Sequence, residues 1–266
     1  MRNGNFQKTI VRDLKQRIKL YKYRATTPRD LKNNDTFIVE FPKSGITWLC
    51  TLIINYVHAI EKRHARASLF NVNQFIQGVH VNQNISEYTL PGLHCRLIKS
   101  HSEYNPLYNN VIYLLRNPVS VMESYYRYCI DLSICEMTFY EFVRSNKFGV
   151  GQWKSHVESW LMKDVSPAKL HLIKYEDILN NGKKELSELF SNMGLLLNDE
   201  VLEDVLVESS LGSMREKQSL YSKHNPAFSL EFVRKNKEKF DSGSEAREYV
   251  LSECSELVER FYPELD

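Results

Sequence analysis

The sequence lacks the long apolar segments that direct a chain into or across a membrane. No stretch approaches the ~20 apolar residues of a membrane span, and residues 1–24 contain no apolar core of the kind that a signal peptide needs. The five cysteines form no CxxC pair, and an odd number of scattered cysteines fits reduced thiols and argues against a zinc site. We therefore expect a soluble, cytoplasmic protein with no membrane span and no metal.

Low-complexity tracts, internal repeats and long Pro/Gly/Ser linkers are also missing, so nothing divides the 266 residues into separate globular domains. Neither sign of charge is in excess, because 35 Lys and Arg face 33 Asp and Glu, a net charge of +2. Nucleic-acid-binding proteins usually carry a basic patch or stripe, so this balance indicates no nucleic-acid partner. Any bound anion must be held by basic residues that gather at one site.

Short, continuously apolar runs predict buried β-strands, with helical patterns between them. Continuous apolar strands are typical of a parallel sheet covered on both faces, and strands that alternate with helices predict a doubly wound α/β fold. We expect one such domain over residues 35–266, with helices on both faces of the sheet, preceded by a helical extension over residues 1–34. The predicted strands are Thr36–Phe41, Cys95–Ile98, Val111–Leu115 and Leu170–Ile173.

Three helical segments follow from the same spacing argument. Residues 48–60 carry their apolar side chains on one stripe, which predicts a helix after the first strand. Pro118 can begin a helix after the third strand, because its missing N–H would be unpaired there. Residues 11–23 predict an amphipathic helix that packs on the domain with a solvated face, and a membrane-surface role is the alternative.

Polar or basic residues follow each predicted strand at its carboxyl end. The sequences are PKSG after the first strand, KSH after the second, RNP after the third and KYED after the fourth. In open α/β sheets, ligands bind outside the carboxyl ends of the strands. The sequence therefore predicts an anion-binding site at this edge of the sheet.

The first of these segments, residues 41–48 (FPKSGITW), has the layout of a phosphate-binding loop. A strand, a tight turn at Gly45 and a helix that starts near Ile46 would aim backbone N–H groups at an anion. Lys43 would add a full positive charge, and Ser44 and Thr47 would add hydroxyls. The GxxxxGK[ST] spacing of a Walker A loop is absent. An ordinary strand–turn–helix with a surface lysine is the alternative.

The other strand ends supply a candidate base and a second anion-binding group. His101 follows a buried strand, and a histidine near its ordinary pKa of ~6.5 can take a proton from a hydroxyl. The positive charge of Lys99 would help to keep His101 neutral and so able to act as a base. Arg116 has a planar fork suited to phosphate oxygens, and Ser124 lies about two helical turns further on. Tyr175 could border a nucleobase. For each residue, an ordinary structural role is the alternative.

Together these segments resemble the sulfotransferases that use 3′-phosphoadenosine 5′-phosphosulfate (PAPS). The PKSGTTW-like loop of that family reads PKSGITW here, and its KTH-like segment is similar to KSH at residues 99–101. The YLxRNPxDVxxSYY-like segment is matched at residues 113–126, and the GxWxxHVxxW-like segment at residues 151–160. A YED sequence follows at Tyr175. These motifs occur in order from about Asp35 to Asp177, and together they are highly specific.

The resemblance implies a role for each matched residue. The loop would hold the 5′-phosphosulfate, Trp48 would also lie against the adenine, and the catalytic group would be His101, Lys43, Lys99 and Ser124. Arg116 and Ser124 would hold the 3′-phosphate. Tyr175 and Ser209 would contact the adenine, and Arg234 and Lys235 would close over the 3′-phosphate. The implied donor-binding residues are Lys43, Ser44, Gly45, Ile46, Thr47, Trp48, Arg116, Ser124, Tyr175, Ser209, Leu211, Arg234 and Lys235.

The chain also departs from the family pattern. Ile46 replaces a threonine of the loop, and Leu211 stands where an adenine-stacking phenylalanine is common. Asn236 replaces the glycine after Arg234 and Lys235, and the GxW segment that usually follows is missing. These changes put the expected C-terminal lid in question, whereas the rest of the donor site matches.

The resemblance implies sulfuryl transfer from PAPS, with PAP (3′-phosphoadenosine 5′-phosphate) as product, to a hydroxyl or amine of a small-molecule or glycan acceptor. Residues 71–92 and 131–149 could form acceptor-side loops, and their aromatic residues could line a pocket or belong to the core: Phe75, Phe139, Tyr140, Phe142 and Phe148. A homodimer is left open. One alternative is a P-loop kinase, but the Walker A lysine and the magnesium-binding aspartate that a kinase needs are not evident in this sequence. The other is a non-catalytic nucleotide-binding protein on the same fold.

Overall fold

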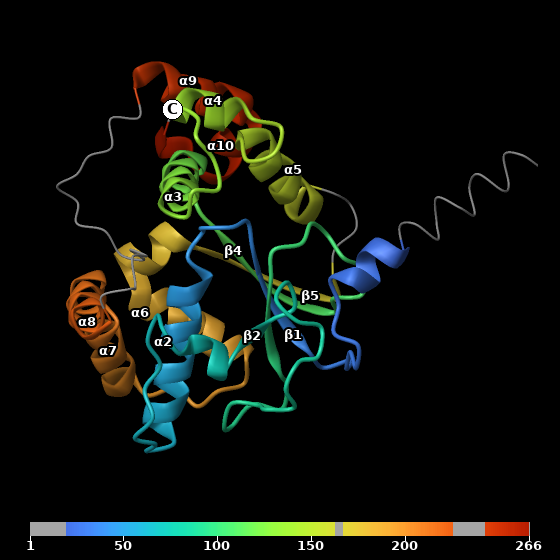
Figure 1. Cartoon of the computed structure of the whole chain (residues 1–266). Helices are drawn as coiled ribbons and strands as arrows, with labels where there is room; N and C mark the ends of the chain where they lie inside the picture. Colours follow the sequence, from blue (N-terminus) through green and yellow to red (C-terminus); the bar gives the residue numbers. More distant parts are fainter. Residues whose placement is uncertain (1–19, 163–166, 226–242, 266) are drawn as a thin grey trace, which may run out of the picture.

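A parallel β-sheet forms the centre of the molecule in this computed structural model, which describes residues 20–162, 167–225 and 243–265 (Figure 1). The five strands lie in the order β2-β3-β1-β4-β5, and every neighbouring pair is parallel. All carboxyl ends therefore lie at one edge of the sheet. The strands are β1 (Thr36–Glu40), β2 (Gln77–Gly78), β3 (Leu97–Ser100), β4 (Asn110–Leu115) and β5 (Lys169–Lys174).

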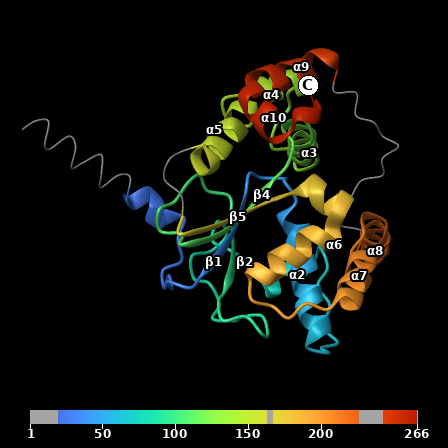
Figure 2. The same ribbon diagram turned by 180° about the vertical axis from the view of Figure 1, so that it is seen from behind.

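Helices cover both faces of the sheet, as Figures 1 and 2 show. One group comprises α3 (Pro118–Asp131), α4 (Phe139–Arg144), α5 (Val150–Leu161), α9 (Ser244–Glu253) and α10 (Ser255–Phe261), with a short η2 turn (Pro263–Leu265) after it. The second comprises α2 (Ile46–Ile60), α6 (Tyr175–Asn192), α7 (Asp199–Glu208) and α8 (Leu211–His224), with the η1 turn (Val72–Gln74). The doubly wound α/β fold predicted from the sequence is confirmed.

The apolar side chains of each strand divide between two cores. Phe37 and Val39 of β1 join the core beneath α3, α4 and α5, whereas Ile38 between them joins the core beneath α2 and α6. Successive side chains of a strand point to opposite faces, so a strand that is covered on both faces must be apolar at every position. This explains why the strands appear in the sequence as continuous apolar runs.

The structure differs from the prediction at several element boundaries, in a strand that was not predicted and in the burial of one helix. The strand expected at Cys95–Ile98 is β3, two residues later, because pairing with β1 sets its register and Arg96 before it is held by Asp30 and Asp35. The two-residue strand β2 is too short to recognise from a pattern. Helix α2 is buried nearly all round rather than along one stripe, and its buried residues include Asn55 and His58.

The described part of the N-terminal segment, residues 20–34, is tied to the domain by polar contacts. Asp30 and Asp35 bind the buried Arg96, whose guanidinium nitrogens lie 2.7 Å from a carboxylate oxygen of each. Asn105 donates to the carbonyl oxygen of Tyr23 at 2.8 Å. The predicted domain boundary at residue 35 stays a prediction, and most of the predicted helix at residues 11–23 lies outside the described residues.

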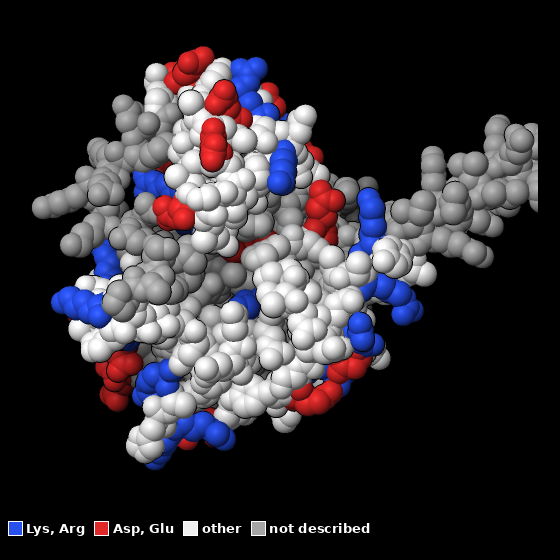
Figure 3. All heavy atoms as spheres, in the orientation of Figure 1, with Lys and Arg blue, Asp and Glu red and all other residues white. Residues whose placement is uncertain are grey.

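Basic and acidic side chains are interspersed on the face drawn in Figure 3, with no large area of one sign. In the described ranges, no helix has the length and apolarity needed to cross a membrane.

Candidate functional site

Four strands deliver the predicted site residues to one edge of the sheet. Strand β1 leads into the loop that carries Lys43, and β3 ends just before His101. On the other side of β1, β4 ends just before Arg116, and β5 ends just before Tyr175. Because all the strands are parallel, segments that are far apart in the sequence meet at this carboxyl edge.

The loop between β1 and α2 turns sharply through two residues in the left-handed region. Lys43 has a φ of 77° and Gly45 a φ of 114°. A non-glycine residue in this region is strained, and such strain is often found at functional sites. Helix α2 starts at Ile46 at the edge of the sheet, where the Ile46 N–H donates to Glu40 Oε2 and the Trp48 N–H donates to the carbonyl oxygen of Gly45. The predicted turn and helix start are therefore confirmed.

The hydroxyl of Ser44 is used within the loop itself. Its Oγ donates to the carbonyl oxygen of Phe41 at 2.9 Å, and the residue is almost fully buried. Lys43 points toward α3, where its Nζ lies 4.3 Å from the centroid of the Tyr128 ring. Ser124 lies one helical turn before Tyr128, so both side chains project from the same side of α3 toward the loop.

Arg116, Tyr175 and Trp48 form one cluster beside this loop. The guanidinium carbon of Arg116 lies 4.2 Å from the centroid of the Tyr175 ring, and its Nη1 donates to the carbonyl oxygen of Lys43 at 3.2 Å. The Trp48 and Tyr175 rings meet edge to face at 5.1 Å. Trp48 Nε1 donates to the carbonyl oxygen of Ser209 at 2.8 Å. Residues expected to contact an adenine nucleotide are thus brought together.

Two further observations describe what the cluster can hold and how tightly it is built. The Nε of Arg116 is buried and has no hydrogen-bond partner within the described ranges, which is costly unless a ligand supplies an acceptor. A Cβ on Gly45 would lie 2.6 Å from Cδ2 of Tyr175, so only glycine lets the loop and the ring approach so closely. The site therefore combines backbone donors, two cations and aromatic rings.

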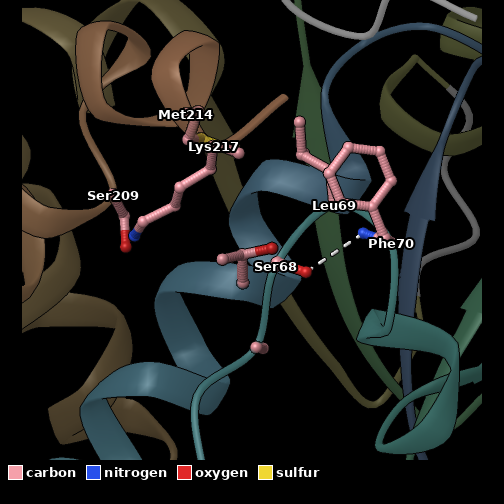
Figure 4. Close-up of a pocket in the computed structure, with 8 residues that line it drawn as sticks. Ser68, Leu69, Phe70, Ser209, Met214 and Lys217 are labelled. Atoms are coloured by element: carbon pink, nitrogen blue, oxygen red, sulfur yellow. Dashed lines mark hydrogen bonds between the residues drawn. The ribbon is translucent and has the colours of Figure 1, made fainter. Parts of the chain in front are cut away.

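A small pocket adjoins this cluster at Ser209 (Figure 4). Ser209 belongs to both, because its carbonyl oxygen binds Trp48 and the residue also lines the pocket. Its hydroxyl lies 3.4 Å from Asn55 Nδ2. Leu211 begins α8 two residues further on. The pocket is lined by Thr51, Ala67, Ser68, Leu69, Phe70, Ser209, Met214 and Lys217.

His101 lies at the end of β3, close to the start of the anion-binding loop. Its Nδ1 is 3.4 Å from the carbonyl oxygen of Glu40 and 3.9 Å from Glu40 Oε1. The pKa of His101 is lowered to about 3, chiefly by burial and then by the neighbouring His80, with smaller contributions from His156 and Lys99, while the hydrogen bond to the backbone of Glu40 raises it. The expectation of a pKa near 6.5 was therefore wrong, because the ring is desolvated. His101 is neutral at neutral pH and can accept a proton.

Sequence reasoning missed three residues at this site. Glu40 ends β1 and is buried next to the anion-binding loop. The His80 ring lies 4.3 Å from the His101 ring, centroid to centroid, and Asn73 Oδ1 accepts a hydrogen bond from Lys99 Nζ. A charged residue at the end of a buried strand could have signalled Glu40, whereas nothing in the local sequence distinguishes His80 or Asn73.

The aromatic residues considered for an acceptor pocket are packed in the cores. Phe139, Phe142 and Phe148 belong to the core beneath α3, α4 and α5, and Tyr140 packs against it. Phe75 packs against the other core. Arg234 and Lys235 lie outside the described residues. No group of three or more His, Cys, Asp or Glu side chains that could hold a metal ion occurs in the part of the chain that the structure describes.

Comparisons with known proteins agree with this geometry. Residues 33–262 match the family described as Sulfotransferase domain. The chain is 28% identical over 208 residues to sulfotransferase 1E1 of Bos taurus, covering 71% of this chain and 69% of that protein. It is 27% identical over 222 residues to sulfotransferase 1A1 of Rattus norvegicus, covering 75% of each.

Two solved structures share the fold. Mouse sulfotransferase SULT7A1, complexed with PAP, aligns with a TM-score of 0.53 and 22% identity over 73% of this chain and 70% of that one. Retinol dehydratase, in complex with androsterone and PAP, aligns with a TM-score of 0.59 and 14% identity over 88% of this chain and 81% of that one.

Proposed function

Because the chain belongs to the sulfotransferase domain family and is therefore an enzyme that moves a sulfuryl group from PAPS, we propose that it sulfates a hydroxyl or amine of a small-molecule or glycan acceptor with His101 as the general base. The observation that carries the proposal is the position of a neutral histidine at the same strand edge as the anion-binding loop. An acceptor next to His101 would also be within reach of that loop.

The residues around the loop would hold the donor. Backbone N–H groups at the start of α2 and the charge of Lys43 suit the 5′-phosphosulfate. Arg116, with its unpartnered Nε, and Ser124 on α3 suit the 3′-phosphate. Tyr175 and Trp48 present rings beside them, where an adenine would pack. PAPS, when bound, supplies the sulfuryl group and a phosphate leaving group.

His101 would act on the acceptor through its Nε2. Its Nδ1 faces the carbonyl oxygen of Glu40, an acceptor that favours a proton on Nδ1 and leaves the lone pair on Nε2. Nε2 would take the acceptor proton as the acceptor's oxygen or nitrogen attacks sulfur and the bond from sulfur to the bridging oxygen breaks. Lys43 and Lys99 would offset the negative charge on the departing phosphate and the transferring group.

Calorimetric binding of PAP, set against ATP with magnesium, tests the donor site. We expect PAP to bind the wild type, and Arg116→Ala to weaken that binding at least about tenfold, since a charged hydrogen bond contributes ~1.5–3 kcal/mol. Binding of ATP with magnesium but not PAP would contradict the proposal and favour a kinase. Binding of neither would favour a non-catalytic relative.

His101→Ala tests the base. Turnover is assayed with an acceptor found by screening, and we expect the variant to have none. Its PAP affinity should stay within about twofold of the wild type, because the imidazole acts on the acceptor rather than on the nucleotide. Full activity in this variant would remove His101 from the mechanism.

A further inference from the structure

Glu40 has a buried carboxyl group at the start of the loop between β1 and α2. It is the last residue of β1, directly before residues 41–45, and is 2% exposed. Its Oε2 accepts the backbone N–H of Ile46 at 2.7 Å. This N–H is the first of helix α2, which is where the loop presents donors to an anion. The carboxyl group therefore lies where the negative charge of the donor must also lie.

A charged Glu40 and a bound phosphosulfate cannot share this place at low cost. Two anions a few ångströms apart in a buried site repel each other strongly, and such pairs hold one proton between them. The Ile46 N–H carries one hydrogen, so it cannot serve both groups fully. A protonated carboxyl group removes the repulsion and adds an O–H donor of its own.

We propose that Glu40 is a member of the donor site, where its carboxyl group takes up a proton as the nucleotide binds and donates a hydrogen bond to an oxygen of the 5′-phosphate or phosphosulfate. The proposal rests on the proposed function, since it concerns the donor of that same site. It adds a neutral acid to a set of residues in which the sequence indicated only cations, hydroxyls and backbone donors.

The surroundings of Glu40 act on its pKa in opposite directions. The pKa of Glu40 is raised to about 8, because the effect of burial outweighs the hydrogen bonds from the backbone of Ile46 and Lys43 and the charges of Lys43 and Arg116, which lower it. A bound anion adds a further raising effect, because it opposes the charged form. Among the described residues, the other titratable groups near Glu40 are His101 at 3.9 Å, Tyr113 and Cys50.

The consequence is a pH dependence of nucleotide affinity that one residue determines. Above about pH 8 free Glu40 is ionised, so binding must take up one proton, and the Kd of PAP rises about tenfold per pH unit. In Glu40→Gln the amide is neutral at every pH, so this rise is absent. The amide also keeps an oxygen that can accept the Ile46 N–H, which makes it a close match in shape.

Isothermal titration of PAP near pH 8.5 (roughly the range in which free Glu40 is ionised), in buffers of different ionisation enthalpy, measures proton uptake directly. We expect uptake of up to about one proton in the wild type and almost none in Glu40→Gln. The control is Glu61→Gln, the same change on an exposed carboxylate just after the opposite end of α2, which should behave as the wild type.

The outcomes separate this inference from the proposed function. PAP binding without proton uptake by the wild type would overturn the inference alone, and this measurement needs no variant to fold. Equal uptake by the wild type and Glu40→Gln would assign the proton to another group and also overturn it. A complete lack of PAP binding at every pH would overturn the donor site and this inference together.

Discussion

Arg116 makes two contacts with different parts of its guanidinium, and a third part is left without a partner. Nη1 holds the carbonyl oxygen of Lys43, the planar face lies on the Tyr175 ring, and Nε stays buried without a partner among the described residues. A lysine has a single ammonium and no plane, so it cannot reproduce this arrangement. The charge of Arg116 is therefore not its only contribution to the site.

Arg116→Lys should accordingly weaken PAP binding by about 10–100-fold although the charge is kept, because the stacked, forked geometry is lost. Calorimetry measures the change. Arg144→Lys is the matched control, since Arg144 also lies over aromatic rings, at 5.2 Å from Tyr140 and 5.1 Å from Tyr249, but on α4. Equal PAP affinity in Arg116→Lys and the wild type would show that charge alone matters.

At the scale of elements, the strand–loop–helix unit of β1 and α2 depends on the backbone of its turn. Gly45 adopts a φ of 114°, and its missing Cβ leaves room for the Tyr175 ring at the start of α6. The local sequence PKSG predicts the turn and the helix start. It does not predict that the ring of a residue 130 positions away packs against the turn, because that contact exists only when β5 lies in the same sheet as β1.

Gly45→Ala should therefore abolish measurable PAP binding and lower the free energy of unfolding by more than backbone strain alone, which is ~1–3 kcal/mol. Gly194→Ala is the matched control: its φ is 74°, and a Cβ there would meet nothing within 4 Å. This control should show only the strain and leave PAP affinity unchanged. Urea unfolding and calorimetry give the two readouts. Identical losses in both variants would mean that contact with Tyr175 is unimportant.

At the scale of the whole molecule, the core beneath α3, α4 and α5 buries His156 in its neutral form. Burial lowers the pKa of His156 to about 4, and its Nδ1 lies 2.8 Å from the hydroxyl of Tyr113. In the unfolded chain this histidine titrates near ~6.5, so the unfolded state binds more protons between those two values. The stability from neutral His156 is complete above about pH 6.5 and is lost as the pH falls toward 4.

His156→Asn, which keeps an acceptor near the position of Nδ1, should therefore show a shallower fall in unfolding free energy on acidification. The change in slope should approach ~1.4 kcal/mol per pH unit between about pH 6 and 5. Glu40, with a pKa raised to about 8, acts in the opposite direction over part of this range, so the difference between variant and wild type is the quantity to measure. An unchanged slope would mean that His156 is not titrating on unfolding.

The sequence by itself determined the parallel sheet and predicted an anion-binding site at its carboxyl edge. Both depend on local patterns: apolar runs that suit strands covered on both faces, and polar residues at each strand end. The donor and the family followed from the resemblance of its motifs to those of the sulfotransferases. His101, Arg116 and Tyr175 could be named because each directly follows a strand. Where each strand begins was less predictable, as β3 shows, because pairing with a neighbour sets its register.

Only the tertiary structure decided which groups contact the site residues and change their pKa values and exposure. It brought Glu40 to the Ile46 N–H, placed His80 against His101, lowered the pKa of His101 through burial, and assigned Phe139, Phe142 and Phe148 to the core. Burial and contact depend on segments that are distant in the chain and become neighbours only when the strands pair. A residue's type shows which chemistry it can perform, and its neighbours in space decide its charge and its exposure.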